Sequence, residues 1–90
     1  MRTPEQKVEE ALRVAVHARG GLCEKFAPIR AGVPDRVVIF KGQVHLVELK
    51  APDGELRPAQ WVFHERARRC GVDVVVLRSV PEVHEWVQGL

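Results

Sequence analysis

Hydrophobic residues follow two different periods along the chain, and together they predict its helices and strands. In the first 19 residues, apolar side chains recur every three or four positions, which is typical of an amphipathic helix. Thr3 and Pro4, with Gln6 after them, form a common helix start, and the pair Gly20 and Gly21 ends that helix. Short β-branched runs further on predict strands. The predicted elements are helices at about 4–19, 58–70 and 81–88, and strands at about 22–27, 36–40, 44–50 and 72–77.

The order of these elements, α-β-β-β-α-β-α, predicts an α/β fold. Two strands separated only by Lys41 and Gly42 form an antiparallel hairpin, and a helix between the third and fourth strands permits a parallel crossover beside it. The run Val72–Leu77 is apolar except for Asp73, and we read it as a strand buried on both faces. We therefore expect a mixed sheet flanked by helices, in a single domain over residues 1–90.

The composition excludes some catalytic nucleophiles but does not indicate which molecule the protein binds. The formal net charge is +2, and 46% hydrophobic with 29% charged residues is ordinary for a globular domain. The chain has no tyrosine and a single serine, Ser79, which excludes a tyrosine nucleophile and disfavours a serine triad. Cys23 and Cys70 lack a CxxC neighbour, so we expect free, core cysteines of a reducing compartment. The absence of a signal-like start or a long apolar run leads us to expect a cytoplasmic or other intracellular protein without a membrane partner.

The hairpin register places three charged residues together. If Lys41 and Gly42 form a two-residue turn, Asp35 faces Glu48 on the neighbouring strand, with Cβ atoms about 5 Å apart. Lys50 follows Glu48 by two residues and therefore projects from the same face. The three side chains are candidates for one site.

Two carboxylates at that separation repel each other unless a cation lies between them. Carboxylate oxygens are what Mg²⁺ prefers, and a lysine beside the ion can orient a water or offset phosphate charge. The alternative is structural, with Asp35 capping a strand while Glu48 and Lys50 form a solvated ion pair at a sheet edge. Apart from His45 and Glu48, residues 44–49 are apolar on both faces, which indicates a central strand and favours the metal site.

Beyond these three residues, the chain resembles the VRR-Nuc (virus-type replication-repair nuclease) family of the PD-(D/E)xK nuclease superfamily. The resemblance rests on GVPD at 32–35, ELK at 48–50, an acidic first helix ending in Gly-Gly, a Lys-Phe strand and a Pro-x-Gln helix start. It implies an αβββαβ core, here with a short C-terminal helix. It also implies hydrolysis of DNA phosphodiesters by water, dependent on Mg²⁺ or Mn²⁺ and without a small-molecule cofactor. The implied metal ligands are Asp35, Glu48, the backbone carbonyl of Leu49 and a glutamate of the first helix.

The resemblance does not decide which glutamate of the first helix that is. Glu5 lies on the side of the apolar stripe, Glu9 lies one turn further on near it, and Glu10 points away. The distance to the Gly-Gly pair favours Glu5, with Glu9 as the alternative. A plain solvated helix terminus, where acidic residues suit the helix dipole, is the remaining interpretation.

A second helix adds another expected site residue. In the superfamily a glutamine near the start of this helix contacts the active site or the DNA backbone, and Gln60 matches it. Some relatives continue as QxxxY, whereas here the fourth residue on is His64. None of the four histidines has metal-ligand spacing, so we expect His64 on the surface or in packing.

Arginines near the motif are candidate DNA contacts. Arg30 precedes GVPD and Arg57 follows ELK, although single arginines of this kind are usually solvated. Trp61 falls on the polar side of its helix, where it either marks a partner surface or lies under the C-terminal helix.

Together these residues predict a metal-dependent, structure-specific DNA endonuclease. A homodimeric Holliday-junction resolvase fits best, because short family members resemble such enzymes and a two-fold dimer presents two sites to a four-way junction. One alternative is a nuclease acting on flaps, ends or a specific sequence, as restriction enzymes do. Another is a catalytically silent DNA-binding or assembly module of the same fold.

Overall fold

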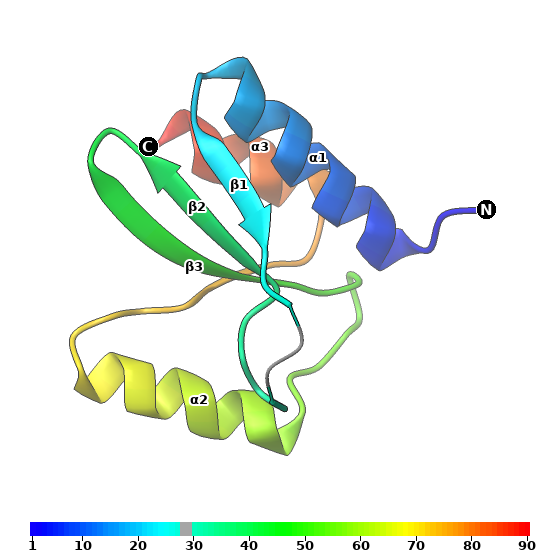
Figure 1. Cartoon of the computed structure of the whole chain (residues 1–90). Helices are drawn as coiled ribbons and strands as arrows, with labels where there is room; N and C mark the ends of the chain where they lie inside the picture. Colours follow the sequence, from blue (N-terminus) through cyan, green and yellow to red (C-terminus); the bar gives the residue numbers. More distant parts are fainter. Residues whose placement is uncertain (28–29) are drawn as a thin grey trace.

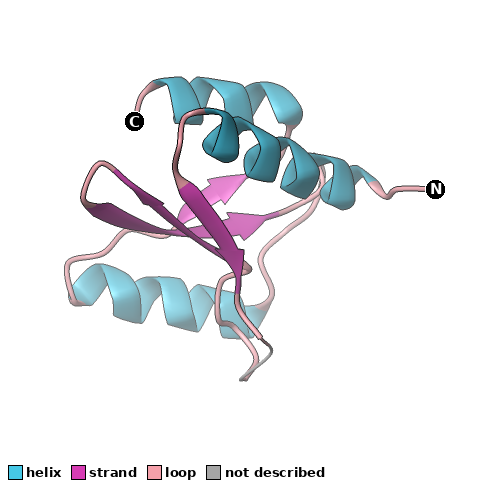
Figure 2. Ribbon diagram, turned by 45° about the horizontal axis from the view of Figure 1, so that its top comes forward, coloured by secondary structure: helices cyan, strands magenta, loops and turns pink. Residues whose placement is uncertain are grey.

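A four-stranded mixed sheet separates two layers of helices in the computed structural model, which describes residues 1–27 and 30–90 (Figures 1 and 2). The strand order is β1-β2-β3-β4, with β1, β2 and β3 antiparallel and β4 parallel to β3. None of the described helices is both long enough and apolar enough to cross a membrane. The elements are α1 (Pro4–Ala18), β1 (Leu22–Lys25), β2 (Arg36–Phe40), β3 (Gln43–Leu49), α2 (Pro58–Arg69), β4 (Val75–Leu77) and α3 (Val80–Gln88).

Hydrogen bonds among the first residues of α1 explain where this helix begins. The Thr3 hydroxyl accepts a hydrogen bond from the Gln6 N–H, and the Gln6 side chain accepts one from the Thr3 N–H. Two of the helix's unpaired amide groups are thereby satisfied, and Pro4 supplies a helical φ at the first position. The predicted capping box is confirmed.

The hairpin of β2 and β3 has the predicted register. Lys41 and Gly42 both have positive φ, 51° and 77°, as a tight two-residue hairpin turn requires. Phe40 is then paired with Gln43, and the ladder continues to Arg36 opposite Val47. This pairing decides which side of the sheet each charged residue of the site occupies.

The apolar core lies on one face of the sheet only. Helices α1 and α3 contact each other and cover this face, while α2 crosses the opposite face (Figure 1). Each strand of the sheet contributes at least one residue to the core, β3 contributes two alternate residues, and α1 contributes residues of its predicted apolar stripe. The buried residues are Val8, Leu12, Val16, Cys23, Val38, Val47, Leu49, Leu77, Val83 and Val87.

The fourth strand is shorter than predicted and lies at an edge. It begins at Val75, and Val72 is 41% exposed, so the prediction of a strand buried on both faces is wrong. The end of α2 explains the difference. Gly71 adopts a positive φ of 93°, and the Val72 N–H donates to the Ala67 carbonyl, so these residues cap the helix instead of pairing in the sheet.

The two cysteines have different environments. Both are free in the described structure, as expected, and Cys23 lies in the core. Cys70 is exposed, because it ends α2 on the outer layer, so its prediction as a core residue is wrong. Small differences at the other element ends leave the predicted α/β arrangement intact: β1 ends at Lys25, and α3 begins at Val80.

Candidate active site

Glu48 is a buried acid on the face of the sheet opposite the core. Its neighbours in β3, Val47 and Leu49, point into the core, so the alternation of a strand turns Glu48 toward α2. Its side chain is only 1% exposed. A carboxyl group buried to this extent is rare in proteins without a specific partner.

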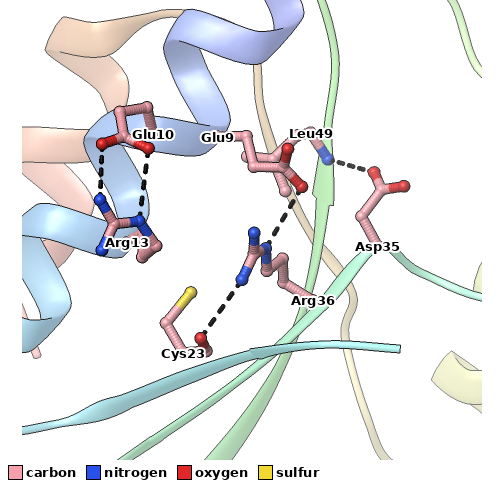
Figure 3. Close-up of polar contacts among 7 residues, drawn as sticks. All are labelled: Glu9, Glu10, Arg13, Cys23, Asp35, Arg36 and Leu49. Carbon is pink, nitrogen blue, oxygen red and sulfur yellow. Dashed lines mark hydrogen bonds and ion pairs between the residues drawn. The ribbon is translucent and has the colours of Figure 1, made fainter. Parts of the chain in front are cut away.

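Asp35 lies immediately before β2, next to the acid on β3. The hairpin register continued by one residue places it opposite Glu48, and its Oδ2 accepts a hydrogen bond from the Leu49 N–H at 2.9 Å (Figure 3). Burial, followed by the contact with Asp35 and its charge, raises the pKa of Glu48 to about 9. Without another cation, the pair therefore carries a proton at neutral pH.

Lys50 supplies the opposite charge beside this pair. It follows β3 directly, its N–H donates to the Leu77 carbonyl at 3.0 Å, and it is 8% exposed. Its ammonium group lowers the pKa of Glu48, but by less than burial and Asp35 raise it. The lysine charge alone does not keep both carboxylates ionised.

The first turn of α2 holds one oxygen of the buried acid. Gln60 donates from Nε2 to Oε2 of Glu48 at 3.3 Å, while its own Oε1 accepts from the Arg57 N–H at 2.8 Å. With one amide group, Gln60 thus accepts a hydrogen bond from the backbone N–H that precedes α2 and donates one to Glu48. The oxygen and the nitrogen of the Gln60 amide are both hydrogen-bonded, which fixes the orientation of the amide.

His64 lies one helical turn further along α2, against the other oxygen. Its Nε2 is 3.6 Å from Oε1 of Glu48, and its side chain is 13% exposed. Neither of these two atoms has a hydrogen-bond partner among the described residues. Burial, with a smaller effect of the Lys50 charge, lowers the pKa of His64, so the imidazole is neutral at neutral pH.

The structure separates the two candidate glutamates of α1. Glu9 accepts from Nε of Arg36 at 3.2 Å, and the same guanidinium donates to the Cys23 carbonyl (Figure 3). Glu5 is exposed, and its charge makes the smallest of the contributions to the pKa of Glu48. Glu9 is therefore engaged in an ion pair, which leaves Glu5 as the helix glutamate without one among the described contacts.

A cleft of about 300 Å³ opens beside Asp35. Three basic residues line it, Lys25, Arg30 and Arg57, together with Gln60. The Arg30 guanidinium lies 5.8 Å from the centre of the Phe63 ring, so α2 supports it. The cleft places positive charge next to the acidic pair.

Comparison with known proteins gives these residues a context. A family profile described as the VRR-NUC domain matches residues 2–81. The chain is 40% identical over 77 residues to "Putative nuclease p44" of Acyrthosiphon pisum secondary endosymbiont phage 1, covering 83% of each protein. A solved structure of a VRR-NUC domain matches with a TM-score of 0.86 and 31% identity over 97% of both chains.

The chain belongs to the VRR-NUC family. Its mixed sheet and flanking helices are the α/β nuclease fold that the sequence predicted, and the chain is a nuclease domain. In this VRR-NUC domain, Asp35, Glu48, Lys50 and Gln60 meet at one point of the sheet, with Glu5 nearby.

The acids of this VRR-NUC domain fit a divalent cation. Among the described residues, no three His, Cys, Asp or Glu side chains form a ready metal cluster. Mg²⁺, however, is commonly held by one or two carboxylates with water completing the shell. The unpartnered Oε1 of Glu48 and the proton shared with Asp35 are what a cation would resolve.

Two residues of the VRR-NUC site were not found from the sequence. His64 was expected on the surface or in packing, and its side chain is packed and 13% exposed, but the sequence did not show that it packs against Glu48. Its spacing of four from Gln60 was the available signal, since residues four apart share a helix face. Lys25 was not singled out, because only the fold brings β1 beside the cleft.

Proposed function

We propose that this nuclease hydrolyses DNA phosphodiesters with Mg²⁺ or Mn²⁺ held by Asp35 and Glu48, and that it acts on branched DNA as a homodimeric Holliday-junction resolvase. The observation that carries the proposal is Glu48, a buried acid with a pKa raised to about 9 beside a second acid. A protein that uses Glu48 only for packing gains nothing from this arrangement, because an apolar residue of similar volume avoids the cost of burial.

Each residue of the site would have a different role in the hydrolysis. A bound divalent cation would stabilise negative charge on the phosphate and lower the pKa of a bound water. Asp35 and Glu48 would hold it, with the Leu49 carbonyl as a further ligand and Glu5 acting directly or through water. Lys50 lies where it can position the attacking water and offset charge that develops on the phosphate. Gln60 keeps Glu48 in place through the bond to Oε2.

The basic cleft supports a nucleic-acid substrate. Lys25, Arg30 and Arg57 surround a space that begins at Asp35, so a phosphate chain entering it would bring one phosphodiester to the acids. Arginines bind phosphate through a planar pair of N–H groups and remain charged when partly covered. Binding should therefore weaken steeply with salt.

An exposed apolar row on the sheet supports a second copy of the chain as partner. Leu22 lies opposite Ile39, which lies opposite Val44, across three neighbouring strands. They are 52%, 38% and 62% exposed, on the face that α2 covers only in part (Figure 2). A row of this kind commonly marks a protein interface, and a two-fold pairing would give the two sites that a four-way junction needs.

A strand-cleavage assay tests the activity. The substrates are a four-way junction, a 5′ flap, a splayed arm, single strand and plain duplex, each with Mg²⁺ and with Mn²⁺. Wild type should make symmetric junction cuts, and Lys50→Ala should lose them, whereas Lys41→Ala in the distant hairpin turn should cut normally. Cutting of flaps or ends alone would keep the site and reject the resolvase. Binding without any cleavage by folded wild type would favour the silent module.

Sedimentation velocity tests the partner. Wild type should sediment as a dimer, and Val44→Asp should sediment as a monomer, since it places a charge in the apolar row. Val14→Asp, on the exposed side of α1, is the matched control and should remain a dimer. A monomeric wild type at micromolar concentration would refute the homodimer.

A further inference from the structure

Two buried polar atoms of the site face each other between α2 and β3. They are Oε1 of Glu48 and Nε2 of His64, 3.6 Å apart, and neither has a hydrogen-bond partner among the described residues. Buried polar atoms almost always find a partner, and each orphan needs an explanation. A movement of about 0.7 Å would bring this pair to an ordinary hydrogen-bond distance.

The spacing on α2 shows how such a contact would work. Gln60 and His64 are four residues apart, so both side chains leave the helix on the side that faces the sheet. Gln60 already donates to Oε2 of Glu48. A neutral imidazole with its proton on Nε2 is a donor aimed at the remaining oxygen.

We propose that His64 is a positioning residue that donates from Nε2 to Oε1 of Glu48 when this carboxylate is ionised. With Gln60 on the other oxygen, α2 then holds Glu48 at both oxygens and fixes the direction in which its free lone pairs point. This inference rests on the proposed function, because the oriented carboxylate is the one assigned to the cation. Partners of this kind typically change metal affinity by about 10- to 100-fold.

The competing possibility is that the imidazole binds the cation itself. Nε2 would then carry a lone pair instead of a proton, and it would be a nitrogen ligand in a site otherwise made of oxygen. Two measurements on wild type alone separate these arrangements. In the Mg²⁺-loaded protein, long-range ¹H–¹⁵N correlation should show the proton of His64 on Nε2, and in the Mn²⁺-loaded protein pulsed EPR should show no directly bound nitrogen.

Variants of His64 measure how much its contact with Glu48 contributes to metal affinity. His64→Phe keeps an aromatic ring and removes the donor, while His64→Gln places an amide nitrogen close to the position of Nε2. Mn²⁺ affinity, measured by calorimetry, should fall about 10- to 100-fold in His64→Phe and return to within about threefold of wild type in His64→Gln. His84→Phe, on the exposed side of α3, is the control and should bind as wild type does.

The possible outcomes are distinct. Unchanged Mn²⁺ affinity in His64→Phe, a directly bound nitrogen, or a proton on Nδ1 would each overturn the positioning role while leaving the proposed nuclease site in place. Failure of wild type to bind Mn²⁺ at all would overturn both. If His64→Phe does not fold, the two spectroscopic measurements on wild type and the affinity of His64→Gln still decide the question.

Discussion

Replacing Glu48 with glutamine should remove a pH dependence from the stability of the metal-free protein. The folded-state pKa of Glu48 is raised from an ordinary value of 4.5 to about 9, chiefly by burial and then by Asp35. A carboxyl group shifted in this direction stabilises the fold fully below its unfolded pKa, and the stabilisation is lost as pH rises toward the folded pKa. Between these limits the folded protein holds a proton that the unfolded chain has released.

The window from pH 7 to 8.5 isolates this effect and gives its size. The pKa of His64 is lowered by burial, and its opposite contribution is confined to pH values near and below its ordinary value of 6.5. One proton of difference corresponds to about 1.4 kcal/mol per pH unit, so wild type should lose about 2 kcal/mol across the window relative to Glu48→Gln. For a chain of this size, that is a large share of the total stability.

Urea denaturation in EDTA, followed by circular dichroism at several pH values, measures the difference. Subtracting the variant from wild type cancels the titrating groups that do not interact with Glu48, including the buried Cys23 thiol, whose pKa burial also raises. A difference that stays constant across pH 7–8.5 would refute the assignment of a protonated Glu48. With saturating Mn²⁺, this pH dependence should disappear from wild type, because the bound cation displaces the proton and Glu48 is then ionised in both the folded and the unfolded states.

Three further changes follow from other contacts. Glu5→Gln should weaken Mn²⁺ binding and DNA cleavage several-fold with little effect on stability, whereas Glu9→Gln should leave the metal affinity unchanged. Calorimetry on both variants measures this, and a loss of Mn²⁺ affinity in Glu9→Gln alone would show that Glu9 is the site glutamate. Gly32→Ala should destabilise the protein by more than about 1 kcal/mol, because a Cβ there would lie 2.3 Å from the Ala59 carbonyl oxygen at a φ of +93°, and an unchanged melting temperature would contradict this. Ser79→Ala removes the cap of α3 and should cost about 1 kcal/mol in denaturation while cleavage per folded molecule stays normal. Loss of activity in folded Ser79→Ala protein would contradict the expectation that the cap of α3 affects only stability.

The sequence predicted the parts of the fold that depend on local signals. The register of β2 and β3 followed from the turn at Lys41 and Gly42, and it was enough to place Asp35 beside Glu48. The start of α1 followed from its capping box. In each case, residues close in sequence determine the geometry, so pattern alone is sufficient.

What the sequence did not predict depends on contacts between distant segments. The strand at Val75–Leu77 was extended too far, since an apolar run does not reveal that its first residues cap α2. The approach of His64 to Glu48 depends on how α2 crosses the sheet, because the spacing of four from Gln60 indicates a shared helix face but not what that face contacts. The ion pair between Glu9 and Arg36, which bears on the choice between Glu5 and Glu9, joins α1 to β2, and no pattern within α1 reveals it.

The second helix has a consequence for motion. Across its described length, α2 has no buried residue, whereas α1 and α3 both bury side chains in the core. Segments with little buried surface open locally at a lower free energy than the rest of a protein. Amide hydrogens of α2 should therefore exchange with solvent through partial openings that leave α1 and β3 protected, and an ion at Glu48 should slow that exchange. The helix that carries Gln60 and His64 would thus be ordered in part by the ligand it helps to hold.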